Sequence, residues 1–462
     1  MTAQPWLLIT SRPLEQLEST RRPLATSAFH AYASAWPAAA FEDCIDAQGQ
    51  LFTRLGVGSD NRIDVQGQQL TVMTSSRNVT PLYWSADHHG HFVLSSDLLM
   101  AASAWGSLTD SPLAVREDAG VRLDDSSSIH GINRLPHSSV LQVVMEGRQA
   151  RIERGTAQDH LAAQSARYTD PLLAGQAQIA ALQQSITDHL RRPGKVAALV
   201  SGGVDSGLVA ALLAAQCPNF EAFSIGTPWG NEFDDAQQLA DALGRPLNRV
   251  ELDPQSILLA LPQTIRAFGH PQAVAVEIGV AITAFCRQLE EGRLIFTGYG
   301  SDLINSGLAT GDGLADDIRS SIAIEVNKTR YSSELTSLAA QSCGSELTHP
   351  YWDPSVLRTA LDTCPSVKTA RGREKGHLRL AAEQWLPSEA AWRKKTAIHH
   401  GNGLGTALAQ FIDTTTGQPN SAAALYRQIL VTLLDQAVRA PLAPLEAQEV
   451  LDRSLQSLAR HR

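Results

Sequence analysis

Residues 199–206 carry small, hydroxylated and acidic side chains in an order that suits the binding of a polyphosphate. They read Leu-Val-Ser-Gly-Gly-Val-Asp-Ser, after an apolar run and before a segment of helical periodicity. Adjacent glycines let backbone N–H groups approach phosphate oxygens, serine hydroxyls add donors, and a helix N-terminus adds partial positive charge. We therefore predict a pyrophosphate-binding loop between a buried strand and a helix. Its predicted ATP contacts are Leu199, Val200, Ser201, Gly202, Gly203, Asp205 and Ser206.

The acidic residue of this loop indicates how its charge is balanced. A carboxylate beside phosphate is repelled unless a cation lies between them, so Asp205 predicts bound Mg²⁺. The loop has no Walker lysine, which favours release of intact pyrophosphate and transfer of AMP over transfer of the γ-phosphoryl group. The alternative is a glycine-rich turn in an ordinary α/β domain. It is disfavoured because strand, Ser-Gly-Gly, Asp-Ser and helix occur in the required order.

A second apolar strand opens into glycines and an aspartate at residues 294–302, Leu-Ile-Phe-Thr-Gly-Tyr-Gly-Ser-Asp. Open parallel sheets bind ligands at the carboxyl ends of their strands, so Asp302 can bring a second carboxylate to the same magnesium ion. We assign Gly298 to the nucleotide and Gly300 to the substrate. Tyr299, at the mouth of the strand, is a candidate general base.

The loop at 199–206 resembles the pyrophosphatase loop of the asparagine synthetase superfamily, whose members activate a carboxylate as an acyl-adenylate and transfer it to an amine. The resemblance covers nearly all of residues 170–405, and residues 348–353, Thr-His-Pro-Tyr-Trp-Asp, belong to it. Residues 223–233 are similar to the adenine-side strand and acidic turn, which assigns Ser224 and Ile225 to ATP. Asparagine synthetases carry Gly-Glu-Gly-Ser-Asp-Glu at 298–303. This chain carries Gly-Tyr-Gly-Ser-Asp-Leu, similar to β-lactam synthetases.

The resemblance also implies the remaining catalytic groups. It pairs Tyr299 with Glu334, and a phenol with an unperturbed pKa of about 10 needs such a carboxylate to orient it or accept its proton. From the residues alone, Glu334 would more often be a solvated helix residue. In the motif Trp-Arg-x-Lys the resemblance selects Lys395 to stabilise the oxyanion of the tetrahedral intermediate, with Arg393 and Lys394 as adjacent alternatives.

Three further features of the synthetase region could contribute to the active site. Glu277 is a lone acid in an apolar run, so we expect it to receive a substrate cation or hydroxyl, or equally to pair with a core arginine or lysine. The glycine-rich loop at 401–405 is expected to close over the intermediate and exclude water. His399 and His400 either contact phosphate or are partly exposed loop residues.

Composition limits the class of protein. The chain has 462 residues, 43% hydrophobic and 18% charged, which suits a globular protein of about two to three domains. A net charge of −9 without a basic block argues against a nucleic-acid partner. Five scattered cysteines without Cys-x-x-Cys spacing indicate reduced thiols in a cytoplasmic protein. No stretch suits a signal peptide or a membrane span, and a homodimer is possible.

The character of the chain changes near residue 165. Residues 1–160 hold short β-branched and aromatic runs at 69–74, 91–94 and 140–144, which predict an antiparallel sandwich. From Tyr168 the periodicity is helical, so we predict a two-domain α/β protein with a boundary at about 155–168. Residues 165–462 then form the synthetase domain, a parallel sheet of the ATP-pyrophosphatase type with many helices.

Residues 1–160 resemble the glutaminase half of asparagine synthetases, an Ntn-type fold, on residues 77–83, 95–97 and 132–136. That half works with an N-terminal cysteine exposed after methionine removal. Here residue 2 is Thr2, so we expect a degenerate glutaminase fold kept as a scaffold, although a threonine with a free α-amine can also be a nucleophile.

Together these features predict a β-lactam synthetase that uses ATP and Mg²⁺ to adenylate an amino-acid substrate and close its ring. The substrate could belong to the clavam, carbapenam or tabtoxinine type. An amidotransferase like asparagine synthetase is disfavoured by Thr2 and Tyr299, and a lasso-peptide cyclase is a further alternative. A binding protein without activity is disfavoured because Asp205, Asp302 and Lys395 are intact.

Overall fold

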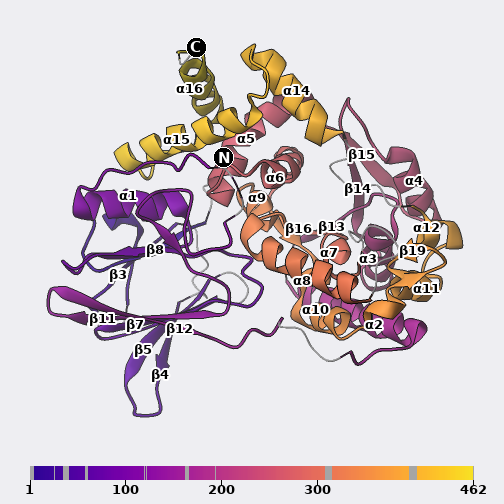
Figure 1. Ribbon diagram of the computed structural model, residues 1–462, viewed down its shortest axis with the longest axis horizontal. Helices are drawn as coiled ribbons and strands as arrows, with labels where there is room; N and C mark the ends of the chain where they lie inside the picture. The colour runs from indigo at the N-terminus through magenta and orange to yellow at the C-terminus, as the bar shows by residue number, and fades with distance from the viewer. Residues whose placement is uncertain are drawn as a thin grey trace.

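The computed structural model describes residues 5–24, 27–34, 41–57, 61–118, 120, 122–161, 166–192, 194–306, 315–394 and 403–460. Figure 1 shows two parts side by side, one built from β-sheets and one in which helices surround a further sheet. We call residues 5–161 the first part and residues 166–460 the second part. The prediction of a two-part α/β chain with antiparallel sheets and a parallel sheet is confirmed. The likeness of the first part to a glutaminase stays a prediction.

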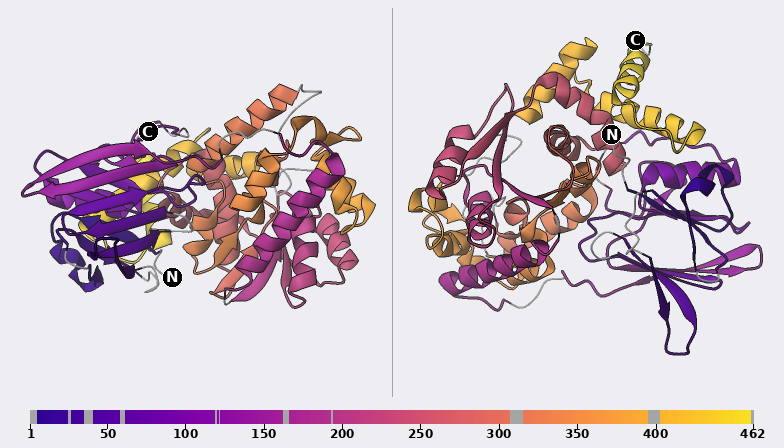
Figure 2. Two further views of the ribbon diagram at one scale, coloured as in Figure 1. Left: turned by 90° about the horizontal axis from the view of Figure 1, so that it is seen from below. Right: turned by 180° about the vertical axis from the view of Figure 1, so that it is seen from behind.

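The first part is a sandwich of two six-stranded sheets, which Figure 2 shows from below and from behind. One sheet has the order β10-β8-β9-β1-β3-β2 and the other β12-β11-β7-β6-β5-β4, and all their strand pairs are antiparallel. The strands are β1 (Leu7–Thr10), β2 (Arg21–Arg22), β3 (His30–Ala33), β4 (Phe41–Ile45), β5 (Leu51–Val57), β6 (Asn61–Gln66), β7 (Gln69–Met73), β8 (Tyr83–Ala86), β9 (Phe92–Ser95), β10 (Asn133–Arg134), β11 (Ser139–Glu146) and β12 (Gln149–Thr156).

The core of the sandwich follows from side-chain alternation along its strands. Residues of β6 are alternately buried and partly exposed, as expected for a strand with one face against a core. Ile9 of one sheet and Ile63 of the other lie in the same apolar cluster. The predicted runs at 69–74, 91–94 and 140–144 correspond to β7, β9 and β11.

The second part contains a five-stranded parallel sheet with the order β15-β14-β13-β16-β17. The strands are β13 (Lys195–Leu199), β14 (Glu221–Gly226), β15 (Leu247–Glu251), β16 (Arg293–Phe296) and β17 (Glu346–Thr348). From β13 the chain runs outward to β14 and β15 and then returns to β16 on the other side of β13. This reversal is the topological switch point at which open sheets bind ligands.

Helices cover both faces of this sheet, so its central strands β13, β14 and β16 are largely apolar on both sides. Along β13 and its extension, Ala197 and Leu199 belong to one core, whereas Ala198 and Val200 belong to another. The helices of the second part are α2 (Pro171–His189), α3 (Val204–Gln216), α4 (Phe233–Ala242), α5 (Pro254–Phe268), α6 (Ala273–Cys286), α7 (Ser301–Ile304), α8 (Ala315–Ser332), α9 (Ser337–Gln341), α10 (Pro354–Leu361), α11 (Gly376–Ala382), α12 (Ser388–Trp392), α14 (Leu404–Thr416), α15 (Ala422–Arg439) and α16 (Ala447–Arg460).

Short elements complete the chain. They are the 3₁₀ turns η1 (Glu15–Thr20), η3 (Pro350–Trp352) and η4 (Pro365–Val367) and the hairpin of β18 (Thr369–Ala370) and β19 (Arg373–Glu374). The last antiparallel strand ends at Thr156 and α2 begins at Pro171, on either side of the predicted boundary. Of the glycine loop predicted at 401–405, residues 401 and 402 lie outside the described residues, Gly403 is the N-cap of α14, and Leu404 and Gly405 belong to the helix itself.

The two parts share a hydrophobic core. Helix α1 (Leu98–Thr109) of the first part packs against α15, and both belong to one apolar cluster with α5 and α6. Asp97 caps α1, since its carboxylate accepts hydrogen bonds from the backbone of Leu99 and Met100. Among the helices that the structure describes, none is both long enough and apolar enough to cross a membrane.

Candidate active site

A cavity of about 470 Å³ lies at the carboxyl ends of β13, β14 and β16, and residues of α6 and α8 form its other walls. Most residues predicted for the site line it. These are Leu199, Val200, Ser201, Gly203, Asp205, Ser206, Ser224, Ile225, Gly298, Tyr299, Gly300, Asp302 and Glu334. The predicted phosphate loop and the predicted catalytic pair, Tyr299 and Glu334, therefore line the same cavity.

The loop after β13 is fixed by its own hydroxyl groups. Ser206 Oγ accepts a hydrogen bond from the backbone of Ser201 at 3.1 Å and lies 3.0 Å from Ser201 Oγ. Gly203 is the N-cap residue of α3, and as a glycine it has no side chain to accept hydrogen bonds from the first backbone N–H groups of the helix. The first backbone N–H groups of α3 and its positive end are thus directed to the loop, an arrangement suited to phosphate.

Gly202 packs against α4 and does not line the cavity. Its φ is +77°, and a Cβ would lie 2.5 Å from the carbonyl carbon of Asp235. Arg393 joins the same two segments, because its Nη1 donates to the carbonyl oxygens of Gly202 at 3.1 Å and Asp235 at 3.3 Å. Gly202 therefore lets the phosphate loop pack against α4.

The end of β16 approaches the phosphate loop closely at Gly298. A Cβ on Gly298 would lie 2.3 Å from the backbone nitrogen of Ser206 and 2.6 Å from the carbonyl carbon of Asp205. Both atoms belong to the backbone, so no rotamer change could make room. Glycine at this position brings the ends of β13 and β16 together.

Asp205 and Asp302, the two predicted metal ligands, meet at one lysine that we did not predict. Lys375 Nζ lies 2.5 Å from Asp205 Oδ2 and 2.5 Å from Asp302 Oδ1, and its side chain is fully buried. Burial lowers the pKa of Lys375 while Asp205 acts against that shift. Lys375 follows the β18–β19 hairpin and precedes α11. The sequence signal was a single lysine before an apolar helix, which does not distinguish it from an exposed residue.

The two carboxylates also suit a magnesium ion. Because both contact one ammonium group, their oxygens converge on a small volume at the cavity wall. Mg²⁺ is usually held by one or two carboxylates together with substrate phosphates. In the part of the chain that the structure describes, no group of three or more His, Cys, Asp or Glu could hold a metal alone. Asp205 and Asp302 therefore fit Mg²⁺ only if phosphate oxygens complete its coordination.

Tyr299 and Glu334 meet in the same cavity. Tyr299 donates its hydroxyl hydrogen to Glu334 Oε2 at 3.3 Å. Glu334 is 5% exposed, and its other oxygen lies 3.7 Å from Lys328 Nζ. Burial and the neighbouring Glu334 carboxylate raise the pKa of Tyr299 well above its usual value. The phenol is therefore protonated at neutral pH, and Glu334 is the acceptor of the pair.

His349 joins the two segments that carry this pair. Burial lowers the pKa of His349 to about 4, so the imidazole is neutral at pH 7. Its Nε2 binds the carbonyl oxygen of Leu335, which requires a donor, and its Nδ1 then accepts from Thr297 Oγ1 at 2.6 Å. Thr297 Oγ1 in turn accepts from the backbone N–H of Tyr299 at 3.1 Å. The motif at 348–353 thus supplies a support that the sequence left without a role.

The basic segment after α12 is described only in part. Arg393 is held by Gly202 and Asp235, while the exposed Lys394 lines the cavity. Lys395, His399 and His400 lie outside the described residues. The predicted oxyanion role of Lys395 stays a prediction.

Glu277 is placed differently from the other predicted residues. It lies on α6 beside Ile278, which lines the cavity, but is not itself among the described lining residues. Burial raises its pKa to about 7, and its charge acts on the buried Tyr426 of α15. No ion pair of Glu277 is found among the described residues, so the expected partner, whether substrate or core cation, stays unidentified.

Comparison with known proteins adds independent information. The family model described as asparagine synthase matches residues 179–335 and 335–459. A carboxyethyl-arginine β-lactam-synthase of Streptomyces clavuligerus is 25% identical over 355 residues, which cover 75% of this chain and 67% of that protein. Asparagine synthetase B of Escherichia coli is 23% identical over 48% of this chain and 44% of its own length.

A solved ammonia-dependent NAD synthetase from Campylobacter jejuni aligns with 60% of this chain and 99% of its own, at 16% identity and a TM-score of 0.25. This likeness is too low to support an argument. The family match covers more than half of the chain and includes the phosphate loop, the Tyr299 strand and Glu334.

Proposed function

Because the chain belongs to the asparagine synthase family, we propose that it is an ATP-dependent β-lactam synthetase acting on a β-amino-acid-type substrate. Family membership and the β-lactam-synthase relative indicate an ATP-dependent enzyme that forms amide bonds. Ring closure and the substrate class are the proposal. The observation that carries it is the Tyr299–Glu334 pair, 3.3 Å apart in the cavity that the phosphate loop opens into.

In the first half-reaction a substrate carboxylate oxygen attacks the α-phosphorus of ATP, an acyl-adenylate forms, and pyrophosphate leaves. The phosphate loop binds the polyphosphate through backbone N–H groups and the hydroxyls of Ser201 and Ser206. Lys375, which is buried in contact with both aspartates, supplies positive charge near the departing pyrophosphate. When bound with ATP, Mg²⁺ would be held by Asp205 and Asp302 and would neutralise charge on the pyrophosphate.

In the second half-reaction an amine of the same substrate attacks the activated carbonyl, the ring closes, and AMP leaves. The amine must lose a proton at this step. The Tyr299 hydroxyl can accept it while passing its own proton to Glu334, so the pair acts as one base. Lys395 is proposed to stabilise the oxyanion of the tetrahedral intermediate.

A tyrosine of raised pKa suits this relay. A free phenolate would exist only well above neutral pH, whereas a protonated phenol that donates to a buried carboxylate is in position at pH 7. Lys328, 3.7 Å from Glu334, helps to keep that carboxylate oriented. The nucleophile lies within the substrate, so no ammonia is required, and Thr2 in place of a cysteine agrees with a first part that releases none.

The test is product analysis with a pool of β-amino acids, ATP and Mg²⁺. We expect AMP and pyrophosphate in equal amounts, together with a product lighter than its substrate by one water. Stoichiometric ADP and orthophosphate would contradict the adenylation step. Appearance of ¹⁵N from labelled glutamine in the product would instead identify an amidotransferase, the activity named for the Escherichia coli relative.

A further inference from the structure

The turn that carries Glu334 leaves regular structure at the end of α8. Ser333 has a φ of 59° and Thr336 a φ of 56°, a left-handed conformation that residues with a Cβ rarely adopt. Such a backbone persists only where its surroundings fix it. After Glu334 the turn is fixed by His349, which binds the carbonyl oxygen of Leu335.

Before Glu334 the chain is fixed by residues of the first part. The last carbonyl groups of an α-helix have no partner within the helix. At the end of α8 the carbonyl oxygen of Arg330 accepts hydrogen bonds from Asn78 Nδ2 at 2.8 Å and from Arg134 Nη2 at 3.1 Å. The carbonyl oxygen of Tyr331 accepts one from Arg134 Nη1 at 2.7 Å. All three bonds are buried.

The side chains are suited to this task. Arg134 is 6% exposed, and its guanidinium binds two successive carbonyl groups, which fixes the direction of the last helical turn. It places a cation at the negative end of the α8 dipole and lies 5.1 Å from the centre of the Tyr331 ring. Asn78 has a φ of 50°, which asparagine tolerates better than most residues.

A second contact supports the same helix end. The guanidinium of Arg330 binds both carboxylate oxygens of Asp159, at 3.0 and 3.1 Å. Asp159 lies after β12, in the segment that leads from the first part to the second. The first part and its connecting segment therefore hold both the backbone and a side chain of the last turn of α8.

We propose that Asn78 and Arg134 are positioning residues for Glu334, and we call this pair the α8 brace. Tyr299 extends from the parallel sheet, whereas Glu334 follows α8, so their 3.3 Å contact depends on where α8 ends. The α8 brace sets that end from the first part. The sandwich thus has a function in ring closure that needs no nucleophile of its own. Its catalytic consequence rests on the proposed function, but its effect on the turn does not.

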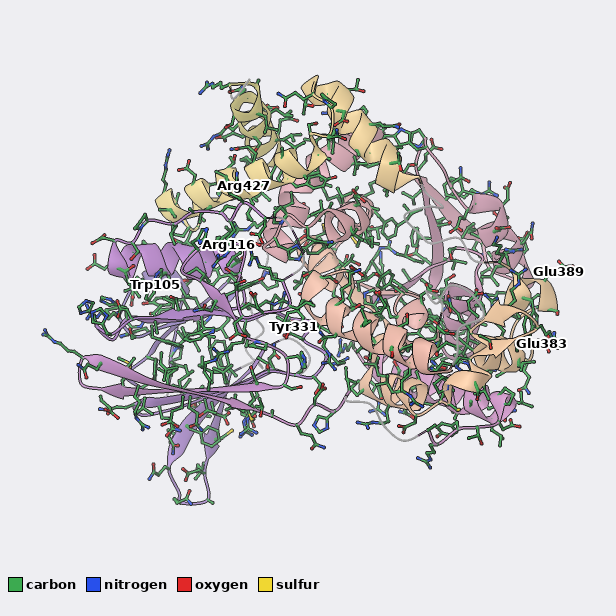
Figure 3. All side chains as sticks on the ribbon, in the orientation of Figure 1. Trp105, Arg116, Tyr331, Glu383, Glu389 and Arg427 are labelled. Carbon is green, nitrogen blue, oxygen red and sulfur yellow. The ribbon has the colours of Figure 1, made fainter. Side chains whose placement is uncertain are left out.

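The experiment needs a control that weakens the interface between the two parts without touching the end of α8. Arg427 of α15 makes a similar contact elsewhere, because its Nε and Nη2 donate to the carbonyl oxygens of Arg116 and Val115 at 3.1 and 3.3 Å. Figure 3 labels Arg116 and Arg427 on the upper side of the junction and Tyr331 nearer its middle. Arg427→Met is therefore a matched control.

The experiment compares Arg134→Met, Asn78→Gly and Arg427→Met with the unaltered chain. Asn78→Gly removes one donor but keeps the positive φ, so it tests the brace even where Arg134→Met fails to fold. Backbone amide hydrogen exchange of residues 331–338 is followed by peptide mass spectrometry. We expect exchange there about 10-fold faster in both brace variants and unchanged in Arg427→Met, because the turn loses its fixed start.

Kinetics test the consequence for catalysis. Substrate-dependent exchange of labelled pyrophosphate into ATP should stay within about twofold in the brace variants, while ring closure falls by up to about 10²-fold, since a shift near 1 Å can have that effect. KM for ATP should not change. The proposal is overturned if the brace variants match Arg427→Met in both hydrogen exchange and closure. If the unaltered chain closes no ring, the proposed function fails, and the hydrogen exchange of residues 331–338 still decides the brace.

Discussion

The contact between Gly298 and the phosphate loop allows a substitution whose effect can be worked out from distances. In Gly298→Ala the new Cβ would lie 2.3 Å from the backbone nitrogen of Ser206, whereas ordinary contact begins at 3.4 Å. The end of β16 and the phosphate loop must therefore separate by about 1 Å, a misplacement that can cost about 10²-fold in rate. The φ of Gly298 is not in the left-handed region, so the contact alone causes the effect.

The assay has a binding arm and a catalytic arm. Titration calorimetry with ATP and Mg²⁺ should show weaker binding in Gly298→Ala, and pyrophosphate exchange should fall by about 10²-fold because Asp205 and Asp302 no longer converge. Gly207→Ala is the control, since its new Cβ would meet only the ends of flexible leucine side chains, at 3.0 and 3.3 Å. Native affinity and native exchange in a folded Gly298→Ala would refute the reasoning.

Three further predictions concern ionisable groups. Tyr299→Phe and Glu334→Gln should each slow ring closure while pyrophosphate exchange persists, and the double variant should be little worse than either, because the pair acts as one base; additive effects would contradict this. Lys375→Met should lower Tm, since breaking a buried ion pair costs about 3–5 kcal/mol, and Mg²⁺ should raise Tm more in the variant than in the native chain. Burial raises the pKa of Glu277 from 4.5 to about 7. The contribution of this carboxyl group to the free energy of unfolding is therefore present below pH 4.5 and is lost as the pH rises through about 7. Glu277→Gln should therefore gain Tm relative to the native chain between about pH 5 and pH 8, and a constant difference would refute the assignment.

The parts of the site that were predicted from sequence are those in which strand, turn and helix are adjacent along the chain. The loop after β13 and the end of β16 carry their chemistry within a few residues, and periodicity located both. The pairing of Tyr299 with Glu334, 35 residues apart, came from resemblance. Neither the spacing nor the composition of the sequence indicates that the end of α8 lies beside the end of β16.

The groups that were missed are brought to the site by long-range packing. Lys375 reaches Asp205 from 170 residues further along the chain, and its burial depends on the β18–β19 hairpin and α11. Lys328 lies on α8, whose last turn is hydrogen-bonded by residues of the first part. Glu277 stays a prediction with two alternatives, a substrate group or a core cation, because the residue is not among the described residues that line the cavity.

The packing of α1 against α15 has a consequence for synthesis on the ribosome. Helix α1 packs against β8 and β9 on one side and against α15 on another, and α15 begins at Ala422, so more than 300 residues are translated after Thr109 before the face of α1 toward α15 is covered. At the usual rate of about 5–20 residues per second, that surface stays exposed for roughly 15 to 60 s. A chaperone that binds apolar helices on nascent chains would find α1 accessible throughout this interval. A fragment that stops before α15 would carry the same exposed surface permanently, which favours aggregation over independent folding.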